Sequence, residues 1–494
     1  MSEDALSRRE AAKLLGGALL ARFTAEPIAL AQKHSRPTST KPTQPQPTQR
    51  PDFSDEAYSD QDDVAPPEGL TTEDEAFLME LQQRGCLYFT EQTDARTGQV
   101  LDRAINRRST GDRDERTTAS IAATGFGLTA LCIAHKEGYI ASDQVQRQVL
   151  TTLDFHLNHM QHEHGFFYHF NHVSTGRPTS WSEVSSIDTA ILLCGVLTCR
   201  AYFNDGRIKD LATRLYERVE WPWMLNGGTA FSMGWLPGSG FIATRWDHYC
   251  ELMMLYLLAI GSRTHPVPAS SWDAFSRPEM RFRNFQYISG RDPLFVHQYS
   301  HAWFDFARQR DNYANYFQNS VTATRAHKAW LQTLRRGYTD EYWGVTASDW
   351  QHGYTAWGGP PLMGPVDGSV VPCAAAGSLP FLPKECVRTL RACFERFGRD
   401  AWGRYGFCDA FHPEQLWYDP DCLGIDVGIG VIMAENLRTG FVWEMFMRNP
   451  EPTTAMAACN FRDDNTQDTP DTPKPTARRR ARRHFATAPE TPSP

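Results

Sequence analysis

The sequence has no closely paired cysteines, no long apolar run and no excess of basic residues. Its eleven cysteines contain no CxxC pair and no Cys/His ligand spacing, which argues against a zinc site. After the N-terminal region, no stretch supplies the ~20 apolar residues that a membrane span requires. The net charge is −8 and the pI is about 6.1, so the chain as a whole lacks the excess positive charge typical of nucleic-acid-binding proteins. We therefore expect no zinc, no membrane span and no nucleic-acid partner.

Strand signals and internal composition boundaries are also scarce. Between about Thr71 and Pro450 the composition never shifts enough to divide the chain, so we expect one domain over 71–450. Its 41% hydrophobic residues are enough for a sizeable core, and apolar residues at 3–4 spacing predict mostly helices. The predicted helices are Glu73–Gln92, Ala119–Glu137, Ser142–Met160 with Ser142 as N-cap, Glu183–Phe203, Ile208–Val219, Asp247–Gly261, His297–Arg308, Tyr313–Arg336, Pro383–Phe397 and Asp426–Arg438. Short strands are expected only near Gly165–Tyr168 and Gly406–Ala410.

Two segments have too few aliphatic residues to order themselves. Residues 32–70 are rich in Pro, Thr, Gln and Ser, and residues 451–494 are rich in Thr, Pro and Asp. We expect a linker and a disordered tail. The tail carries an arginine-rich run over 478–483, which could contact an anionic surface but is more often simply solvated.

The N-terminal 31 residues resemble a twin-arginine export signal. Arg8 and Arg9 precede a mildly apolar stretch, and Ala29-Leu30-Ala31 could be a cleavage site. This predicts an exported protein, periplasmic or extracellular. The alternative is an uncleaved leader on a cytoplasmic enzyme. Unpaired cysteines within apolar runs suit a protein that folds in a reducing compartment before export.

Two acidic stretches precede apolar helical runs and are flanked by aromatic residues. One carries Glu183 and Asp188 before an apolar run, and the other carries Asp247 and Glu251 before Leu252. A carboxylate at the start of an all-apolar helix is either desolvated or lines a cavity, and desolvation raises its pKa, as a general acid requires. For Glu183, Asp247 and Glu251 the alternative is a helix cap or a favourable dipole interaction, whereas Asp188 lies deeper in its predicted helix. Carboxylates beside aromatic platforms favour a sugar-cleaving site.

Eight ordered motifs resemble those of the glycoamylase-like domain family, which includes bacterial endo-β-1,2-glucanases and the cyclising region of cyclic β-1,2-glucan synthases. The motifs cover nearly all of 71–450. They are FTEQTD (89–94), ASIAATGFG (119–127), GFFYHF (165–170), EVSSIDTA (183–190), WDHYCE (246–251), LFVHQYSHAW (294–303), GVTASD (344–349) and GIDVG (424–428).

The resemblance implies an all-α (α/α)6 toroid, with long loops, minor short strands and a cleft at one end. It also implies hydrolysis of a β-glucan, with β-1,2-linked glucan as the expected substrate and an inverted product. The family's acidic positions carry over to Glu183, Glu251 and Asp426, with Asp188 and Asp247 close by. We expect Glu251 and Glu183 to share the general acid and base roles, and Asp188 or Asp426 to support or replace them. No cofactor or metal is required, and a monomer is expected.

Aromatic and histidine side chains complete the expected binding set. The candidates are Asp247, Trp181, Trp246, His169, His297, Tyr299, His301, Trp303 and Trp343. For the large rings the alternative is an ordinary core position, and Asp349 is expected to shape a turn. Two other functions remain open. One is a transglycosylase that cyclises or transfers glucan chains, and the other is a glycan-binding protein that has lost the chemistry.

Overall fold

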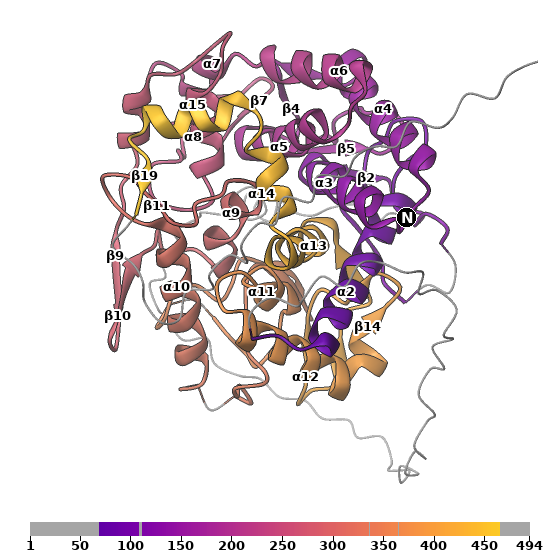
Figure 1. Cartoon of the computed structure of the whole chain (residues 1–494), viewed down its shortest axis with the longest axis vertical. Coiled ribbons are helices and arrows are strands. Elements are labelled where there is room, and N and C mark those ends of the chain that lie inside the picture. The colour runs from indigo at the N-terminus through magenta and orange to yellow at the C-terminus, as the bar shows by residue number, and fades with distance from the viewer. Residues whose placement is uncertain (1–68, 108–110, 335, 364, 465–494) are drawn as a thin grey trace, which may run out of the picture.

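The computed structural model of the chain describes residues 69–107, 111–334, 336–363 and 365–464 (Figure 1). The expected export signal over 1–31, nearly all of the linker and the arginine-rich run over 478–483 lie outside the described residues.

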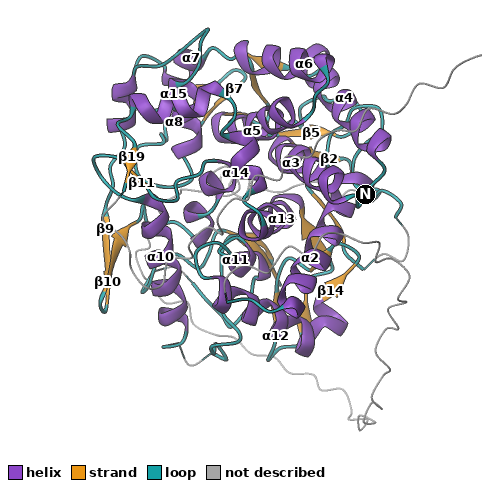
Figure 2. Ribbon diagram, in the orientation of Figure 1, coloured by secondary structure: helices purple, strands orange, loops and turns teal. Residues whose placement is uncertain are grey.

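Helices make up most of the regular structure (Figure 2). The longer ones are α2 (Thr72–Glu91), α3 (Ile121–Glu137), α4 (Ser142–Asn158), α5 (Ser186–Tyr202), α6 (Gly206–Glu217), α8 (Met253–Ile260), α10 (Tyr316–Leu331), α12 (Pro383–Ala401), α13 (Gly424–Arg438) and α15 (Pro450–Ala458). The short ones are α7 (Trp221–Leu225), α9 (Tyr299–Trp303), α11 (Pro372–Ala376) and α14 (Phe441–Phe446), with 3₁₀ turns η1 (Ala269–Asp273) and η2 (Leu294–His297).

The strands are short and pair as small antiparallel ribbons. They are β1 (Arg103–Ile105) with β18 (Asp421–Leu423), β2 (Thr118–Ser120) with β5 (Phe170–His172), β3 (His162–Glu163) with β4 (Phe166–Phe167), β6 (Val184–Ser185) with β7 (Gly234–Leu236) and β8 (Gly240–Phe241), β9 (Glu279–Phe282) with β10 (Phe285–Ile288), β11 (Gln309–Arg310) with β19 (Arg462–Asp463), β12 (Ser348–Trp350) with β13 (Gly353–Thr355), β14 (Trp402–Gly403) with β15 (Gly406–Phe407), and β16 (Phe411–His412) with β17 (Trp417–Tyr418). The strands expected near 165–168 and 406–410 are confirmed as β4 and β15.

Two kinds of helix alternate along the chain. In α3, α5, α8, α9, α11 and α13 nearly every side chain is buried, as all-apolar sequences require. In α2, α4, α6, α10 and α12 only one face is buried. Figure 1 shows α13 near the middle of the molecule, with α2, α3, α9, α11 and α14 around it. The buried helices therefore form the core, and the amphipathic ones cover it.

Two glycines bring the buried helices α3 and α5 into close contact. A Cβ on Gly195 would lie 2.1 Å from the carbonyl oxygen of Gly125, so no side chain fits at position 195. A Cβ on Gly125 would meet the backbone of Ile191 at 2.5 Å. The absence of side chains at these positions lets the two backbones approach directly.

The expected boundary at Pro450 is wrong, because the ordered chain continues to residue 464. Helix α15 packs against α8, and β19 pairs with β11. Glu451 is buried and forms an ion pair with Arg200 of α5, while Asn449 accepts from the Arg200 Nε at 2.9 Å. The composition of 451–464 resembles that of the tail, but this ion pair and the apolar side of α15 anchor the segment.

Removing one partner of this ion pair should weaken the fold. Only 1% of the Glu451 side chain is exposed, and breaking a buried pair from one side costs about 3–5 kcal/mol. We expect Arg200→Ala to lower the free energy of unfolding by roughly that amount, measured by chemical denaturation. The surface pair of Glu444 with Arg448, four residues apart, is the matched control, and Arg448→Ala should cost less than about 1 kcal/mol. Equal losses in the two variants would contradict a special role for Arg200.

Several predicted helix boundaries need correction. Residues 247–252 are turns and bends rather than helix, and α8 begins at Met253. The predicted helix His297–Arg308 is reduced to η2 and the short α9. Ser142 is the first residue of α4 and makes no cap; Ala141 occupies the N-cap. Pro383 does occupy the first turn of α12, as predicted.

All eleven cysteines are free and buried. The sulfurs of Cys132 and Cys199 lie 3.6 Å apart between α3 and α5, in the apolar environment that the sequence predicted. Burial raises the pKa of the Cys86 thiol above its usual range, so that it remains protonated at neutral pH. Within the described ranges, no helix combines the length and the apolar character needed to cross a membrane.

Candidate active site

Carboxylates lie at or just before the N-termini of four core helices. Asp188 is the third residue of α5, and Asp426 is the third residue of α13. Glu251 precedes α8 by two residues, and Asp292 precedes the turn that leads into α9. The positive end of a helix dipole favours negative charge. The chain thus places acids near the N-termini of four of its core helices.

The first group joins His169 to two acids of the first motif. The Nδ1 of His169 lies 3.1 Å from a Glu183 oxygen and 3.4 Å from an Asp188 oxygen. The Ser185 hydroxyl donates to the same Asp188 oxygen at 2.5 Å and accepts from the Asp188 N–H. Asp188 therefore also belongs to the N-cap of α5, although the sequence placed it deeper in the helix.

The charge state of this group follows from its contacts. Burial alone would lower the pKa of His169, but the nearby Asp188 and Glu183 carboxylates raise it to about 9. Ligand atoms of these three side chains lie within 4.8 Å of one another, close enough to hold a metal ion. A protonated imidazole already supplies a positive charge there, so the group is a compensated ion triad.

The second group surrounds Glu251. Burial raises the pKa of Glu251 to about 8, and the negative charges of Asp292 and Asp188 contribute to the increase. The Glu251 Oε2 is buried and has no hydrogen-bond partner among the described residues. Hydrogen bonds from the backbone and from Cys250 lower the pKa, but burial outweighs them, so that at neutral pH this carboxyl carries a proton.

Asp292 is held by a histidine on its other side. The Nε2 of His248 lies 3.5 Å from Asp292, and its Nδ1 lies 3.0 Å from Asp247. Hydrogen bonding to Asp292 raises the pKa of His248 to about 9. The protonated histidine leaves Asp292 as a charged neighbour of Glu251.

The third group lies around Asp426. Burial raises the pKa of Asp426 to about 6, with the nearby charges of Asp349 and Asp102 adding to the effect. The Asp426 Oδ2 is buried and has no partner. Asp409 lies beside it, and burial together with the Asp426 charge raises the pKa of Asp409 well above its usual range.

Two side chains connect the three groups electrostatically. The charges of Asp426 and Glu251 both contribute to the raised pKa of Tyr299, which is buried at the start of α9. Asp102 adds to the raised pKa of His169 and to that of Asp426. The acids predicted from separate motifs, 183, 188, 251 and 426, are therefore linked through the charges they share with these two side chains.

Two predicted tryptophans lie at this neighbourhood. Trp181 is 39% exposed, and its ring centroid lies 4.8 Å from that of Phe170, which stacks on His169. Trp246 is buried, and its indole N–H donates to the Ser186 hydroxyl at 2.8 Å. Trp181 thus presents a free aromatic face beside the His169 group, while Trp246 anchors the start of α5.

The remaining ring candidates are core residues. The indole N–H of Trp303 donates to Thr129 at 2.9 Å, and Trp343 is fully buried. The Nδ1 of His297 lies 3.1 Å from the Tyr249 hydroxyl, and the Nε2 of His301 lies 3.1 Å from Ser320. Burial lowers the pKa of both histidines to about 3, so they are neutral packing residues in this structure.

The predicted helix Asp247–Gly261 would place Asp247 and Glu251 on one face, but the structure does not. Because residues 247–252 are not helical, the exposed Asp247 side chain points away and binds His248, and Glu251 is buried. The acid that faces Glu251 is Asp292, which the sequence analysis missed.

Several other acids were also missed. Asp349, expected to shape a turn, is a buried residue of β12 whose Oδ2 accepts from Arg103 at 2.5 Å. Asp409 and Asp419 are buried near it. Each is an isolated acid between small or aromatic residues in the sequence, and only their ribbons bring them together.

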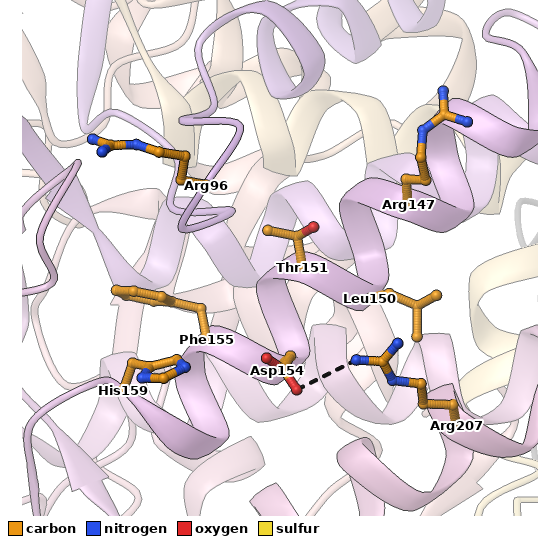
Figure 3. Close-up of a pocket in the computed structure, with 8 residues that line it drawn as sticks. All are labelled: Arg96, Arg147, Leu150, Thr151, Asp154, Phe155, His159 and Arg207. Carbon is orange, nitrogen blue, oxygen red and sulfur yellow. Dashed lines mark ion pairs between the residues drawn. The ribbon is translucent and has the colours of Figure 1, made fainter.

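A surface hollow of about 630 Å³ lies elsewhere, along α4 and the start of α6. Figure 3 shows three arginines around it, Arg96, Arg147 and Arg207, with Asp154 paired to Arg207 at 3.6 Å. Asp154 is its one acid, and it is already neutralised. The hollow therefore lacks the groups of acids found near the N-termini of the core helices, and the candidate site lies at those groups.

Comparison with known proteins finds a matching family model and related enzymes. The family model described as "Putative glucoamylase" matches residues 243–450. The exo β-1,2-glucooligosaccharide sophorohydrolase (non-reducing end) of Parabacteroides distasonis is 26% identical over 423 residues, covering 76% of this chain and 57% of the relative. The chain thus spans little more than half the length of this curated relative.

Solved structures share the fold. The endo-β-1,2-glucanase of Chitinophaga pinensis, in complex with sophorotriose and glucose, is 25% identical with a TM-score of 0.73, covering 80% of this chain and 99% of that chain. The β-1,2-glucanase of Parabacteroides distasonis is 23% identical with a TM-score of 0.73, covering 79% of this chain and 60% of that chain, and it supports the fold alone.

Proposed function

We propose that this chain is a glycoside hydrolase that cleaves β-1,2-glucan. The proposal draws on its glycoamylase-like motifs, the matching family model and the β-1,2-glucan-degrading relatives. The observation that carries the proposal is Glu251, a buried carboxyl protonated at neutral pH within a group of charged acids. A glycosidase needs such a proton donor for the leaving oxygen. We also propose that the protein is exported and acts as a monomer.

The proposed architecture is an (α/α)6 toroid. The six buried helices α3, α5, α8, α9, α11 and α13 would form the inner layer in chain order. Contacts of α3 with α5, α5 with α8, α11 with α13, and α13 with α3 support part of this layer, and α9 also contacts α13. The amphipathic helices would form the outer layer, with their apolar faces inward.

This arrangement suggests the partner of Glu251. Counted around six inner helices, α8 and α13 are directly opposite, while α5 is adjacent to α8. In an inverting hydrolase the base activates a water on the opposite face of the sugar from the acid, with the carboxyls about 6.5–9.5 Å apart. We assign Asp426 as the base and Glu251 as the acid. Glu183, which the sequence analysis paired with Glu251 without deciding which is the acid and which the base, is the alternative.

The His169 group would then bind rather than react. The protonated imidazole contacts Glu183 and Asp188, whose oxygens can accept from sugar hydroxyls. Trp181 offers the exposed ring beside them for stacking against a sugar face. Together they form one wall of the proposed cleft.

Incubation of the purified full chain with linear β-1,2-glucan tests the activity. Chromatography should show short oligosaccharides, and early ¹H NMR spectra should show the inverted anomer. Cyclic or elongated products with a retained anomer would instead establish the transglycosylase. The absence of turnover on β-1,2-glucan, with turnover on another β-glucan in a parallel panel, would overturn the linkage and retain the hydrolase. The absence of turnover on every glucan, with binding intact, would establish a glycan-binding protein.

A further inference from the structure

Three aspartates meet beside Asp426 from separate ribbons. Asp349 lies in β12, Asp409 lies between β15 and β16, and Asp419 lies between β17 and β18. All three are more than nine-tenths buried. Their ligand oxygens lie within 4.8 Å of one another.

Each of these carboxylates uses one oxygen and leaves the other free. The Asp349 Oδ2 accepts from Arg103 at 2.5 Å, the Asp409 Oδ2 accepts from the Asp349 N–H at 2.7 Å, and the Asp419 Oδ1 accepts from the Asp421 N–H at 3.0 Å. The opposite oxygens, Asp349 Oδ1, Asp409 Oδ1 and Asp419 Oδ2, are buried without a hydrogen-bond partner among the described residues. The Asp409 carboxyl is also within hydrogen-bonding reach of the Asp426 carboxyl. Buried polar atoms are almost always satisfied, so the free oxygens of Asp349 and Asp419 beside this pair indicate a missing partner.

The charges of the cluster point to the same conclusion. Arg103 is shared between Asp102 at 3.1 Å and Asp349 at 2.5 Å. Within the described part of the chain, neither Asp409 nor Asp419 forms an ion pair. Carboxyls buried together must either hold protons or bind a cation, and a cation would let all three ionise without repulsion.

We propose that Asp349, Asp409 and Asp419 bind one hard divalent cation, with Ca²⁺ as the best match. Calcium takes carboxylate oxygens at about 2.3–2.6 Å, so two oxygens on one ion are separated by no more than about 5 Å, in agreement with the cluster. One-oxygen coordination, with the second oxygen held by a protein donor, is the arrangement expected of an oriented metal ligand. Backbone carbonyls and water would complete the shell.

Such an ion would be structural. It would strengthen the hydrogen-bonded connection between these ribbons beside α13, next to the proposed base. The ion triad of His169 is the natural comparison, because it contains the same number of close ligand groups but already includes a cationic imidazole. We therefore expect the cation at the first cluster and not at the second.

Terbium luminescence tests the site on the full chain after chelation. Tb³⁺ replaces Ca²⁺ at oxygen sites and is sensitised by nearby tryptophan, which Trp350 supplies next to Asp349 in β12. We expect saturable emission that Ca²⁺ displaces, and a thermal midpoint that rises by about 5 °C in excess Ca²⁺. A parallel Mg²⁺ arm shows which ion is preferred.

Matched variants locate the binding. Asp419→Asn should weaken Ca²⁺ displacement at least about tenfold, whereas Asp188→Asn in the His169 group should leave it within about twofold. If Asp419→Asn does not fold, Asp349→Asn and calorimetric titration of the unmodified protein give the same test. The absence of saturable emission, calorimetric heat and thermal shift with both ions would overturn the proposal, because the carboxyls would then be held by shared protons. Equal weakening in Asp188→Asn would overturn the assignment of the site.

Discussion

Replacing Glu251 with glutamine should lower kcat/KM on linear β-1,2-glucan by about 10²–10⁴-fold, the usual contribution of general acid catalysis. Glutamine keeps the size of the protonated carboxyl but cannot give up a proton to the leaving oxygen. Substrate binding should change little, so the loss should fall on kcat. Steady-state kinetics with reducing-end detection would measure it, with Glu444→Gln, an exposed residue paired with Arg448, as the control.

The pH dependence of the Glu251 variant separates catalysis from packing. The pKa of Glu251 is raised to about 8 in the folded protein, so the acid form and the activity of the native enzyme should be lost as pH rises through that value. The stability that the protonated carboxyl contributes is lost as pH rises from the ordinary value of 4.5 to about 8, because the unfolded chain ionises first. Glu251→Gln has no such titration, so its stability relative to the native chain should rise across this range and then stay constant. An inactive variant that is destabilised at every pH would contradict the catalytic assignment.

Asp426→Asn is expected to cause a loss of similar size, about 10²–10⁴-fold in kcat. An amide in place of the buried, unpartnered Oδ2 cannot take the proton of an attacking water. Because the substitution also removes one negative charge from beside Asp409, the fold should be no less stable. Kinetics and thermal unfolding of the same preparation test both statements.

Azide rescue distinguishes a base from a structural acid. The azide ion attacks without giving up a proton, so it should restore part of the rate of Asp426→Asn and yield a glycosyl azide. It should not restore Glu183→Gln, because Glu183 is held by His169 at 3.1 Å and is assigned to binding, with a loss in KM. Rescue of Glu183→Gln with no rescue of Asp426→Asn would make Glu183 the base, in the Glu251–Glu183 pair that the sequence suggested.

The helical character of the fold was predictable because its core helices are apolar on every side and its outer helices keep a regular stripe. Predictions failed where tertiary contacts override local pattern. The segment before Met253 reads as helix, yet residues 247–252 turn so that Glu251 faces inward and Asp247 faces outward. The segment after Pro450 has a polar composition, yet Arg200 anchors it through Glu451.

The candidate site was predictable only where an acid precedes a long apolar run, as at Glu251, Asp188 and Asp426. Asp292, Asp409 and Asp419 have no such signal, because short ribbons distant in sequence bring them into place. His301 and Trp303 were selected for their chemical type, and packing decides their position in the core. Local pattern thus identifies acids on helices, but it does not identify their neighbours from loops.

The eleven buried, free cysteines have a consequence for how opening of the molecule can be observed. Thiols are distributed from Cys86 to Cys459, so they sample almost the whole ordered chain. A thiol that is buried and protonated does not react with an alkylating reagent until its surroundings open. Labelling each cysteine over time, followed by peptide mass analysis, would therefore map which helices separate first, with no engineered probe. The same burial means that the native fold needs no oxidising compartment to form.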